Sequence, residues 1–304
     1  MRAAKDAPII ISISLREVAE MKNASFFTQT HVYFKKIARI SIREKAWIFL
    51  VFAVVIALIV NLVTASDMFE NLDNTKSGFF TMASACIWIG VFNSIQSICK
   101  EHNIIRSEYR QGTKLSSYVC AHVLWQAVLC FVQSLIIFIV CLIFGFFGDD
   151  FSNGVIMHPL IEYFITIFLL TFGAAVLGLM VSAFSGTPTT AMKIMPFVLI
   201  IQLIMSGVLF ELSGIAENLA VITFSKWGMS AFGSIGDLNS LEPRIASELA
   251  EKIPNFDKSI VAVSDQIYNH EAAVLLTAWG WCLGLTLVFV LIAIISLKIK
   301  NRDS

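Results

Sequence analysis

Charge is scarce in this sequence: Asp, Glu, Lys and Arg make up 14% of its 304 residues, whereas hydrophobic residues make up 57%. A soluble globular domain carries about 25% charged residues. Proline is also scarce, with 6 residues, and phenylalanine is abundant, with 25. This composition is far more apolar than that of a soluble domain and indicates a chain built from lipid-facing helices.

Patterns of metal-binding or catalytic residues are missing as well. The five histidines lie in separate segments, and no HExxH or CxxC spacing occurs. We therefore expect no metal ligand and no catalytic residue. A single sequence does not exclude a Ser-His-Asp catalytic site, although no pattern in this one points to such a site. The basic residues follow the membrane topology described below, so no nucleic-acid partner is expected.

Features of a secreted or cell-surface protein are also absent. Residues 1–45 are too polar to contain the apolar core of a signal peptide. All six cysteines lie within or beside apolar runs, so we expect no extracellular disulfide. The segments predicted to face outward contain no Asn-x-Ser/Thr acceptor. These absences fit an integral protein of a bacterial cytoplasmic (inner) membrane.

Six long apolar runs are present instead. A bilayer core of about 30 Å needs about 20 apolar helical residues, because each residue rises about 1.5 Å. A helix is the expected form, since lipid leaves no partner for unpaired backbone groups. The predicted spans are Trp47–Ala65, Phe79–Ile98, Tyr118–Phe147, Leu160–Phe184, Ala191–Leu212 and Ala272–Ile299.

The distribution of Lys and Arg orients these spans. With the N-terminus inside, 17 of the 22 basic residues fall in cytoplasmic segments, and 15 of the 22 acidic residues fall outside. This is the bias that the positive-inside rule describes. The sequence therefore predicts an all-α integral membrane protein with six spans and both ends in the cytoplasm.

The outward segment before the last span is long. It covers residues 211–271, and loops of this length are usually functional. Glu211–Gly236 stays apolar, so we expect it to be partly re-entrant or to cap the membrane. Pro243–Lys252 reads as a short amphipathic helix with Ile245 and Leu249 on one face.

An amphipathic helix is predicted over Phe26–Lys45, before the first span. Two interpretations are open: an interfacial anchor held by anionic lipid, which this pattern alone favours, or a connection between a soluble motor protein and the first span. Its apolar face contains Tyr33, Phe34, Ile37 and Ile40, and its basic face contains Lys35, Lys36, Arg39 and Arg43.

The segment 100–117 between spans two and three mixes charged and apolar residues. By itself it reads as a solvated, positive-inside loop. Its spacing, however, resembles the first intracellular loop of ABC exporters of the ABCG (White/pigment) type, a branch of the ABC type-2 permeases. The amphipathic helix, the six spans and the long loop with Trp227 are also similar. The residues that carry the likeness are Glu101, Ile104, Arg106, Glu108, Gly112 and Tyr118.

This resemblance implies a permease that works as a dimer with a second copy or a paralogue. A partner ABC ATPase would dock on a coupling helix, and Glu/Arg pairs would clamp that helix to the amphipathic helix. The implied coupling residues are Glu101, Arg106, Glu108, Arg110 and Gly112. The implied segments are a cytoplasmic segment 1–25, a connecting helix 26–45, a permease domain 46–299 with coupling helix 100–117 and extracytoplasmic loop 211–271, and a tail 300–304.

The sequence also departs from the family pattern. Ser107 follows Arg106, where the family usually has Arg directly before its second Glu. The chain contains no Gly-x-x-x-x-Gly-Lys-Ser/Thr loop, so we expect no ATPase activity and no cofactor in this chain. ATP and Mg would bind a partner, which is either a separate subunit or part of a longer chain.

The substrate prediction depends on which side chains the spans carry. No Asp, Glu, Lys or Arg lies in the middle of a span, which argues against a transporter coupled to protons or sodium. In the family arrangement spans two and five face a central cavity, and an apolar wall with a few amides suits a hydrophobic or amphipathic substrate. The candidate contacts are Phe92, Asn93, Gln96, Phe197, Ile201, Gln202 and Met205.

Small residues recur along two spans. Ala83, Cys86 and Gly90 begin a small, weakly polar stripe on span two, and Ala174, Gly178 and Ser182 form a small-xxx-small face on span four. Helix packing is the favoured interpretation for span four. A second functional class also stays open, namely a non-transporting membrane scaffold or a lipid-modifying membrane enzyme. An associated ABC ATPase would distinguish the two classes.

Overall fold

All regular secondary structure in the part that the computed structural model describes is helical. That part comprises residues 25–64, 66, 68–147, 154–210, 212–241, 243–244 and 265–302. The helices are α2 (Phe26–Arg43), α3 (Trp47–Thr64), α4 (Leu72–Ser94), η2 (Cys99–Glu101), α5 (His102–Arg110), α6 (Leu115–Ile143), α7 (Pro159–Phe184), α8 (Pro188–Ile204), α9 (Ile215–Ala220), α10 (Phe224–Ile235), η4 (Gln266–Tyr268) and α12 (Ala272–Arg302).

Five stretches of helix in the described residues are long and apolar enough to cross a membrane. They are Trp47–Thr64, Leu72–Arg110, Leu115–Ile143, Pro159–Phe184 and Ala272–Asn301. They correspond to five of the six predicted spans, and they confirm an all-α integral membrane protein.

The sixth predicted span, Ala191–Leu212, is shorter in the structure than expected. Its helix α8 has 17 residues and ends at Ile204. At about 1.5 Å per residue it measures about 26 Å, less than the hydrocarbon core. The helix stops because Met205 leaves the helical path and Gly207 adopts a φ of +79°, a left-handed conformation that favours glycine. A complete sixth crossing stays a prediction.

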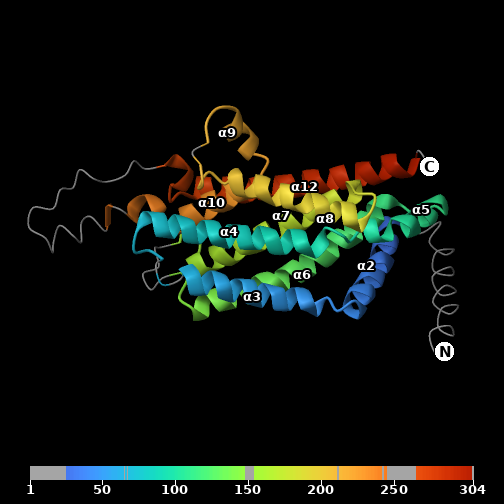
Figure 1. The fold of residues 1–304 in the computed structure, drawn as a ribbon, viewed down its shortest axis with the longest axis horizontal. Coiled ribbons are helices and arrows are strands. Elements are labelled where there is room, and N and C mark those ends of the chain that lie inside the picture. Colours follow the sequence, from blue (N-terminus) through green and yellow to red (C-terminus); the bar gives the residue numbers. More distant parts are fainter. Residues whose placement is uncertain are drawn as a thin grey trace, which may run out of the picture.

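The long helices run side by side along the long axis of the molecule (Figure 1). The amphipathic helix α2 lies obliquely at one end of this bundle, together with α5 and the C-terminal end of α12, whereas α10 lies toward the opposite end. Finding α2 and the C-terminal end of α12 at the same end is what an even number of crossings predicts. We call the end of the bundle that contains α2, α5 and the C-terminal end of α12 the junction end.

Close contact between α4 and α7 forms the centre of the bundle. Gly90 of α4 lies so close to α7 that an added Cβ would overlap the carbonyl oxygen of Thr171. Gly178 of α7 lies equally close to Ser94 of α4, whose Oγ donates to the Ala175 carbonyl oxygen at 2.6 Å. Small residues let two backbones approach and form interhelical hydrogen bonds. The interpretation of the small face of span four as a packing surface is therefore confirmed.

The same face of α7 fixes the end of α4. The hydroxyl of Ser182 accepts hydrogen bonds from the backbone N–H groups of Ile98 and Cys99, at 3.0 and 3.1 Å. These two residues lie where α4 gives way to η2, at a point where backbone donors need a partner outside the helix. The junction end is thereby attached to the central helix pair.

Helix α10 lies in the long segment between α8 and α12, and it packs against α4, α7 and α12. Its Phe232 stacks on Phe79 of α4, with ring centroids 5.7 Å apart, and on Tyr163 of α7, at 6.0 Å. This burial fits the expectation that Glu211–Gly236 is partly re-entrant, although its depth in the membrane stays a prediction. The helix predicted over Pro243–Lys252 lies outside the described residues except for 243–244.

The tight α4–α7 contact predicts the effect of a single added methyl group. Gly90→Ala should lower the free energy of unfolding by about 1–3 kcal/mol, because the Cβ meets backbone that is held by a second helix. Gly280→Ala on α12 is the matched control, since nothing lies within 4 Å of its Cβ position. Thermal unfolding in detergent should show a lower midpoint for Gly90→Ala alone. Equal midpoints for the two variants would contradict this packing.

Candidate functional site

Helix α2 is held against the bundle through one face. Ser25 caps its N-terminus by accepting from the Thr28 N–H, and Arg43 lies in its last turn, where a positive charge is favourable. Tyr33 and Ile37 are buried, and Arg39 is exposed. The predicted apolar and basic faces are therefore both present, and the apolar face packs on α6.

A buried carboxylate joins α2 to α5. Glu108 is 8% exposed, and its two oxygens accept from the Tyr33 hydroxyl at 2.8 Å and the Lys36 ammonium at 2.9 Å. The Tyr33 hydroxyl also lies 3.2 Å from the Thr113 hydroxyl. A buried charge needs such partners, because its desolvation is otherwise uncompensated. The ion pair between the two helices is Glu108–Lys36, so the prediction of Glu/Arg pairs is wrong for Glu108. Arg39, on the same helix, is exposed.

A second carboxylate joins η2 to α6. Glu101 accepts from the Tyr118 hydroxyl at 2.9 Å, and the Nε2 atom of His122 lies 3.9 Å from the same carboxylate. The Tyr118 ring meets the Tyr33 ring edge to face, with centroids 5.5 Å apart. The two carboxylates and the two tyrosines thus form one connected group. We call the group of Tyr33, Lys36, Glu101, Glu108, Tyr118 and His122 the helix junction.

The helix junction shifts the pKa values of its members. Burial raises the pKa of the Tyr33 hydroxyl well above its usual range, and neighbouring Glu108 adds to this effect. Burial also acts to raise the pKa of Glu101, but His122, Lys36 and the Tyr118 hydroxyl outweigh it, so the pKa of Glu101 is lowered. Tyr33 is therefore a neutral donor and Glu101 an ionised acceptor at neutral pH.

An apolar cluster surrounds this polar group. Ile105 of α5 is fully buried, as is Leu297 near the end of α12. The cluster joins α2, α5, α6, α7 and α12, and it is separate from the larger core in the rest of the bundle. The junction end is therefore a packed unit of its own.

The predicted coupling residues occupy different positions in this unit. Glu101 and Glu108 face inward, toward α6 and α2, rather than toward solvent. Arg106 is half-buried, and Arg110 is exposed at the end of α5. Gly112 adopts a φ of +100° in the turn between α5 and α6, a left-handed conformation that favours glycine.

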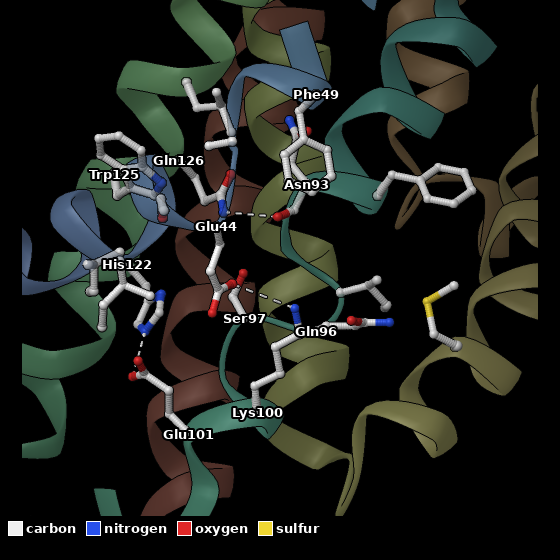
Figure 2. A pocket seen from close by; sticks show the side chains of 18 residues that line it. Glu44, Phe49, Asn93, Gln96, Ser97, Lys100, Glu101, His122, Trp125 and Gln126 are labelled. Carbon is white, nitrogen blue, oxygen red and sulfur yellow. Dashed lines mark hydrogen bonds and ion pairs between the residues drawn. The ribbon is translucent and has the colours of Figure 1, made fainter. Parts of the chain in front are cut away.

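A cavity of about 300 Å³ adjoins the helix junction (Figure 2). Three of the seven predicted substrate contacts line it: Phe92, Asn93 and Gln96. Its other lining residues are Ile37, Ile40, Ser41, Glu44, Ala46, Phe49, Ile95, Ser97, Lys100, Glu101, His122, Trp125, Gln126, Leu129 and Met192. Side chains of α2, α3, α4, α6 and α8 thus line a space within one copy of the chain.

The other four predicted contacts do not line this cavity. Phe197 and Ile201 lie on the outer face of α8, where Phe197 is 70% exposed. Gln202 is buried, and its Oε1 atom accepts from the backbone N–H groups at the start of α10, at 3.0 and 3.2 Å. Its amide therefore caps a helix. Met205 is half-buried where α8 ends.

Sequence reasoning did not assign the α6 side of the cavity. Gln133 exchanges hydrogen bonds with Asn93 and donates to the Phe49 carbonyl oxygen at 3.1 Å, which ties α6 to α4 and α3. Gln126 donates to the Asn93 carbonyl oxygen at 3.4 Å. The sequence did contain a signal for a polar face on α6. His122, Gln126 and Gln133 recur at helical spacing on one face of an otherwise apolar span.

Comparison with known proteins agrees with this architecture. Residues 28–235 match the family described as ABC-2 type transporter. The chain is also similar to an ABC transporter ATP-binding/permease protein of Mycobacterium tuberculosis, with 26% identity over 159 residues. That match covers 52% of this chain but only 18% of the relative's length.

The fold and the match define the class and the family. Apolar helices of membrane-spanning length, together with the family match, make this an integral membrane protein of a transport family. The chain belongs to the ABC-2 type transporter family, and it is a permease component of an ABC transporter. Members of this family generally require an ABC ATPase partner.

The geometry of the helix junction predicts that two Tyr→Phe variants differ in stability. Tyr33→Phe should lower the free energy of unfolding by about 1–3 kcal/mol, because buried Glu108 loses a hydrogen-bond donor. Tyr109→Phe is the control, since the Tyr109 hydroxyl makes no hydrogen bond within the described residues. Thermal unfolding of both variants in detergent measures the difference. A Tyr33→Phe midpoint equal to that of Tyr109→Phe would show that the hydroxyl contributes nothing.

Proposed function

We propose that this chain is the permease subunit of an ATP-driven exporter, and that it receives force from an ABC ATPase through α5 and α2. The buried Glu108, bonded to Tyr33 and Lys36, carries the proposal. A soluble ATPase can act on a membrane domain only through contacts that transmit displacement. A buried carboxylate that accepts a hydrogen bond at each of its two oxygens, between α5 and α2, is such a contact.

The route of the displacement follows the connections of the junction. Helix α5 continues from α4 through η2 and reaches α6 through the turn at Gly112. Helix α2 reaches α3 through a sharp corner at Lys45, whose φ is +63°. A push on exposed Arg110 would therefore move α4 and α6 directly, and it would move α3 through Glu108 and α2.

In this proposal ATP and Mg bind the partner, and the junction end faces the cytoplasm of a bacterial cell. The excess of Lys and Arg in the segments at this end supports that orientation. The relative's printed name combines ATP-binding and permease functions in one protein. Here the ATPase is either a separate subunit or part of a longer chain.

A second permease copy, or a paralogue, would complete the pathway. Helix α8 exposes Phe197 and Ile201, the side chains expected to face a partner across a two-fold axis. A hydrophobic or amphipathic substrate suits an apolar wall of this kind. Between two copies, these exposed side chains would line the path that the substrate takes.

The coupling proposal predicts a selective defect. Glu108→Ala should leave membrane insertion intact but reduce transport per ATP hydrolysed by at least about tenfold, because α5 loses its buried link to α2. Glu70→Ala, an exposed glutamate before α4, is the matched control. Transport and ATP hydrolysis are measured together on vesicles that contain the permease and its ATPase. Unchanged coupling in Glu108→Ala would refute the role of the junction, and failure to associate with any ABC ATPase would favour a scaffold or a lipid-modifying enzyme.

The dimer proposal predicts a specific cross-link. A cysteine at Ile201 should form a disulfide-linked dimer on mild oxidation in membranes, because this exposed face of α8 would lie near its symmetry mate. A cysteine at Leu283, an exposed residue of α12, is the control for random collision. Gel electrophoresis without reductant reports the dimer. Cross-linking at 283 but not at 201 would place the interface on α12 instead.

A further inference from the structure

The cavity beside the helix junction has the size and the mixed lining of a ligand site. Its volume of about 300 Å³ lies at the lower end of the range for small-molecule pockets. Ile40, Phe49 and Leu129 supply apolar surface, and the corner between α2 and α3 supplies Glu44 at the rim. Figure 2 shows polar side chains of α4 and α6 facing the same space.

Two buried side chains of α6 carry polar atoms without a hydrogen-bond partner in this cavity. Gln126 is 2% exposed, and its Oε1 atom accepts no hydrogen bond within the described residues. His122 is 3% exposed, and neither of its ring nitrogens has a hydrogen-bond partner there. Burying such groups without partners is unfavourable. Both side chains line the cavity, so a bound molecule can supply the missing bonds.

The inner part of the cavity offers acceptors and negative charge. Glu101 is ionised, since its pKa is lowered, and one of its oxygens accepts from Tyr118. The Gln126 oxygen is a further acceptor. The nearest lysines are already engaged, because Lys36 pairs with Glu108 and Lys100 lies 3.9 Å from Glu44.

Trp125 adds an aromatic surface to the same wall. A cation over an aromatic ring is attracted by the negative face of the ring. The site therefore favours a compact cation that carries several N–H donors, attached to an apolar chain. An anion would instead meet Glu101 and the unpaired Gln126 oxygen.

We propose that this cavity binds the primary ammonium group of an amphiphile, which donates its N–H groups to Glu101 and Gln126. The apolar chain lies along Phe49 and Leu129. The site is enclosed by a single copy of the chain, and binding needs neither the ATPase nor a second permease. Its failure would therefore leave the coupling proposal untouched.

Two classes of molecule carry a primary ammonium group on an apolar chain. A membrane phospholipid with an ethanolamine headgroup carries it, and so does a free long-chain amine. In the first case the lipid phosphate would compete with Glu44 for Lys100, which lines the cavity and is half exposed. Binding measured in lipid nanodiscs distinguishes the phospholipid from the free amine.

Calorimetric titration of the full-length protein in maltoside detergent tests the proposal, with heats for empty micelles subtracted. Octylammonium chloride should bind at one saturable site. Octyltrimethylammonium has the same charge and chain but no N–H donor, so it should bind at least about tenfold more weakly. Octanoate should show no saturable binding. Equal affinity for the two cations would overturn the proposal, because hydrogen bonding would then play no part.

Variants locate the site. Glu101→Gln and Gln126→Leu should each weaken octylammonium binding by about tenfold or more, because each removes an acceptor. Glu271→Gln, an exposed glutamate before α12, is the matched control and should bind like the wild type. Thermal unfolding identifies a variant that fails to fold. Gln126→Leu changes no charge, so it decides the question if Glu101→Gln is unstable. Wild-type affinity in a folded Gln126→Leu or Glu101→Gln variant would overturn the assignment.

Octylammonium binding in lipid nanodiscs shows whether the natural occupant is a membrane lipid or a free amine. If the occupant is a membrane lipid, nanodiscs of phosphatidylethanolamine should abolish octylammonium binding, and nanodiscs of phosphatidylcholine should not. If the occupant is a free amine, binding should be equal in both. Either result supports the ammonium site and assigns its ligand. Absence of binding in detergent and in both nanodiscs would overturn it.

Discussion

The buried carboxylate of Glu108 is the constraint on which the junction end depends. Its two partners, Tyr33 and Lys36, belong to the amphipathic helix α2, which this carboxylate ties to α5. A carboxylate with this little exposure persists only when both of its oxygens are bonded. The amphipathic helix is therefore fixed by a polar contact as well as by the apolar cluster beneath it.

That contact is anchored in turn by the central pair of helices. Glycines at the α4–α7 contact let the two backbones approach, and Ser182 holds the point where α4 gives way to η2. The junction is thus connected to the rigid part of the bundle through backbone hydrogen bonds. In the proposed coupling, a displacement at α5 would therefore reach α4 through this attachment.

The cavity and the junction share Glu101, and this sharing links ligand binding to the coupling helices. One carboxylate oxygen of Glu101 accepts from Tyr118, whose ring packs on Tyr33, while the carboxylate also lines the cavity. An occupant that bonds to Glu101 would change the field around the whole junction. The proposed ammonium site and the proposed route of force are therefore neighbours, although each is tested separately.

The sequence by itself determined the membrane class, the position of five long helices, the amphipathic helix and the small face of α7, because hydropathy and helical periodicity are local properties. It also indicated the family through the segment 100–117. It did not determine that Glu108 pairs with Lys36, that Gln202 caps α10, or that Gln126 and His122 line a cavity. Only the tertiary structure decided these, because each depends on which residues distant in sequence are brought together when helices pack.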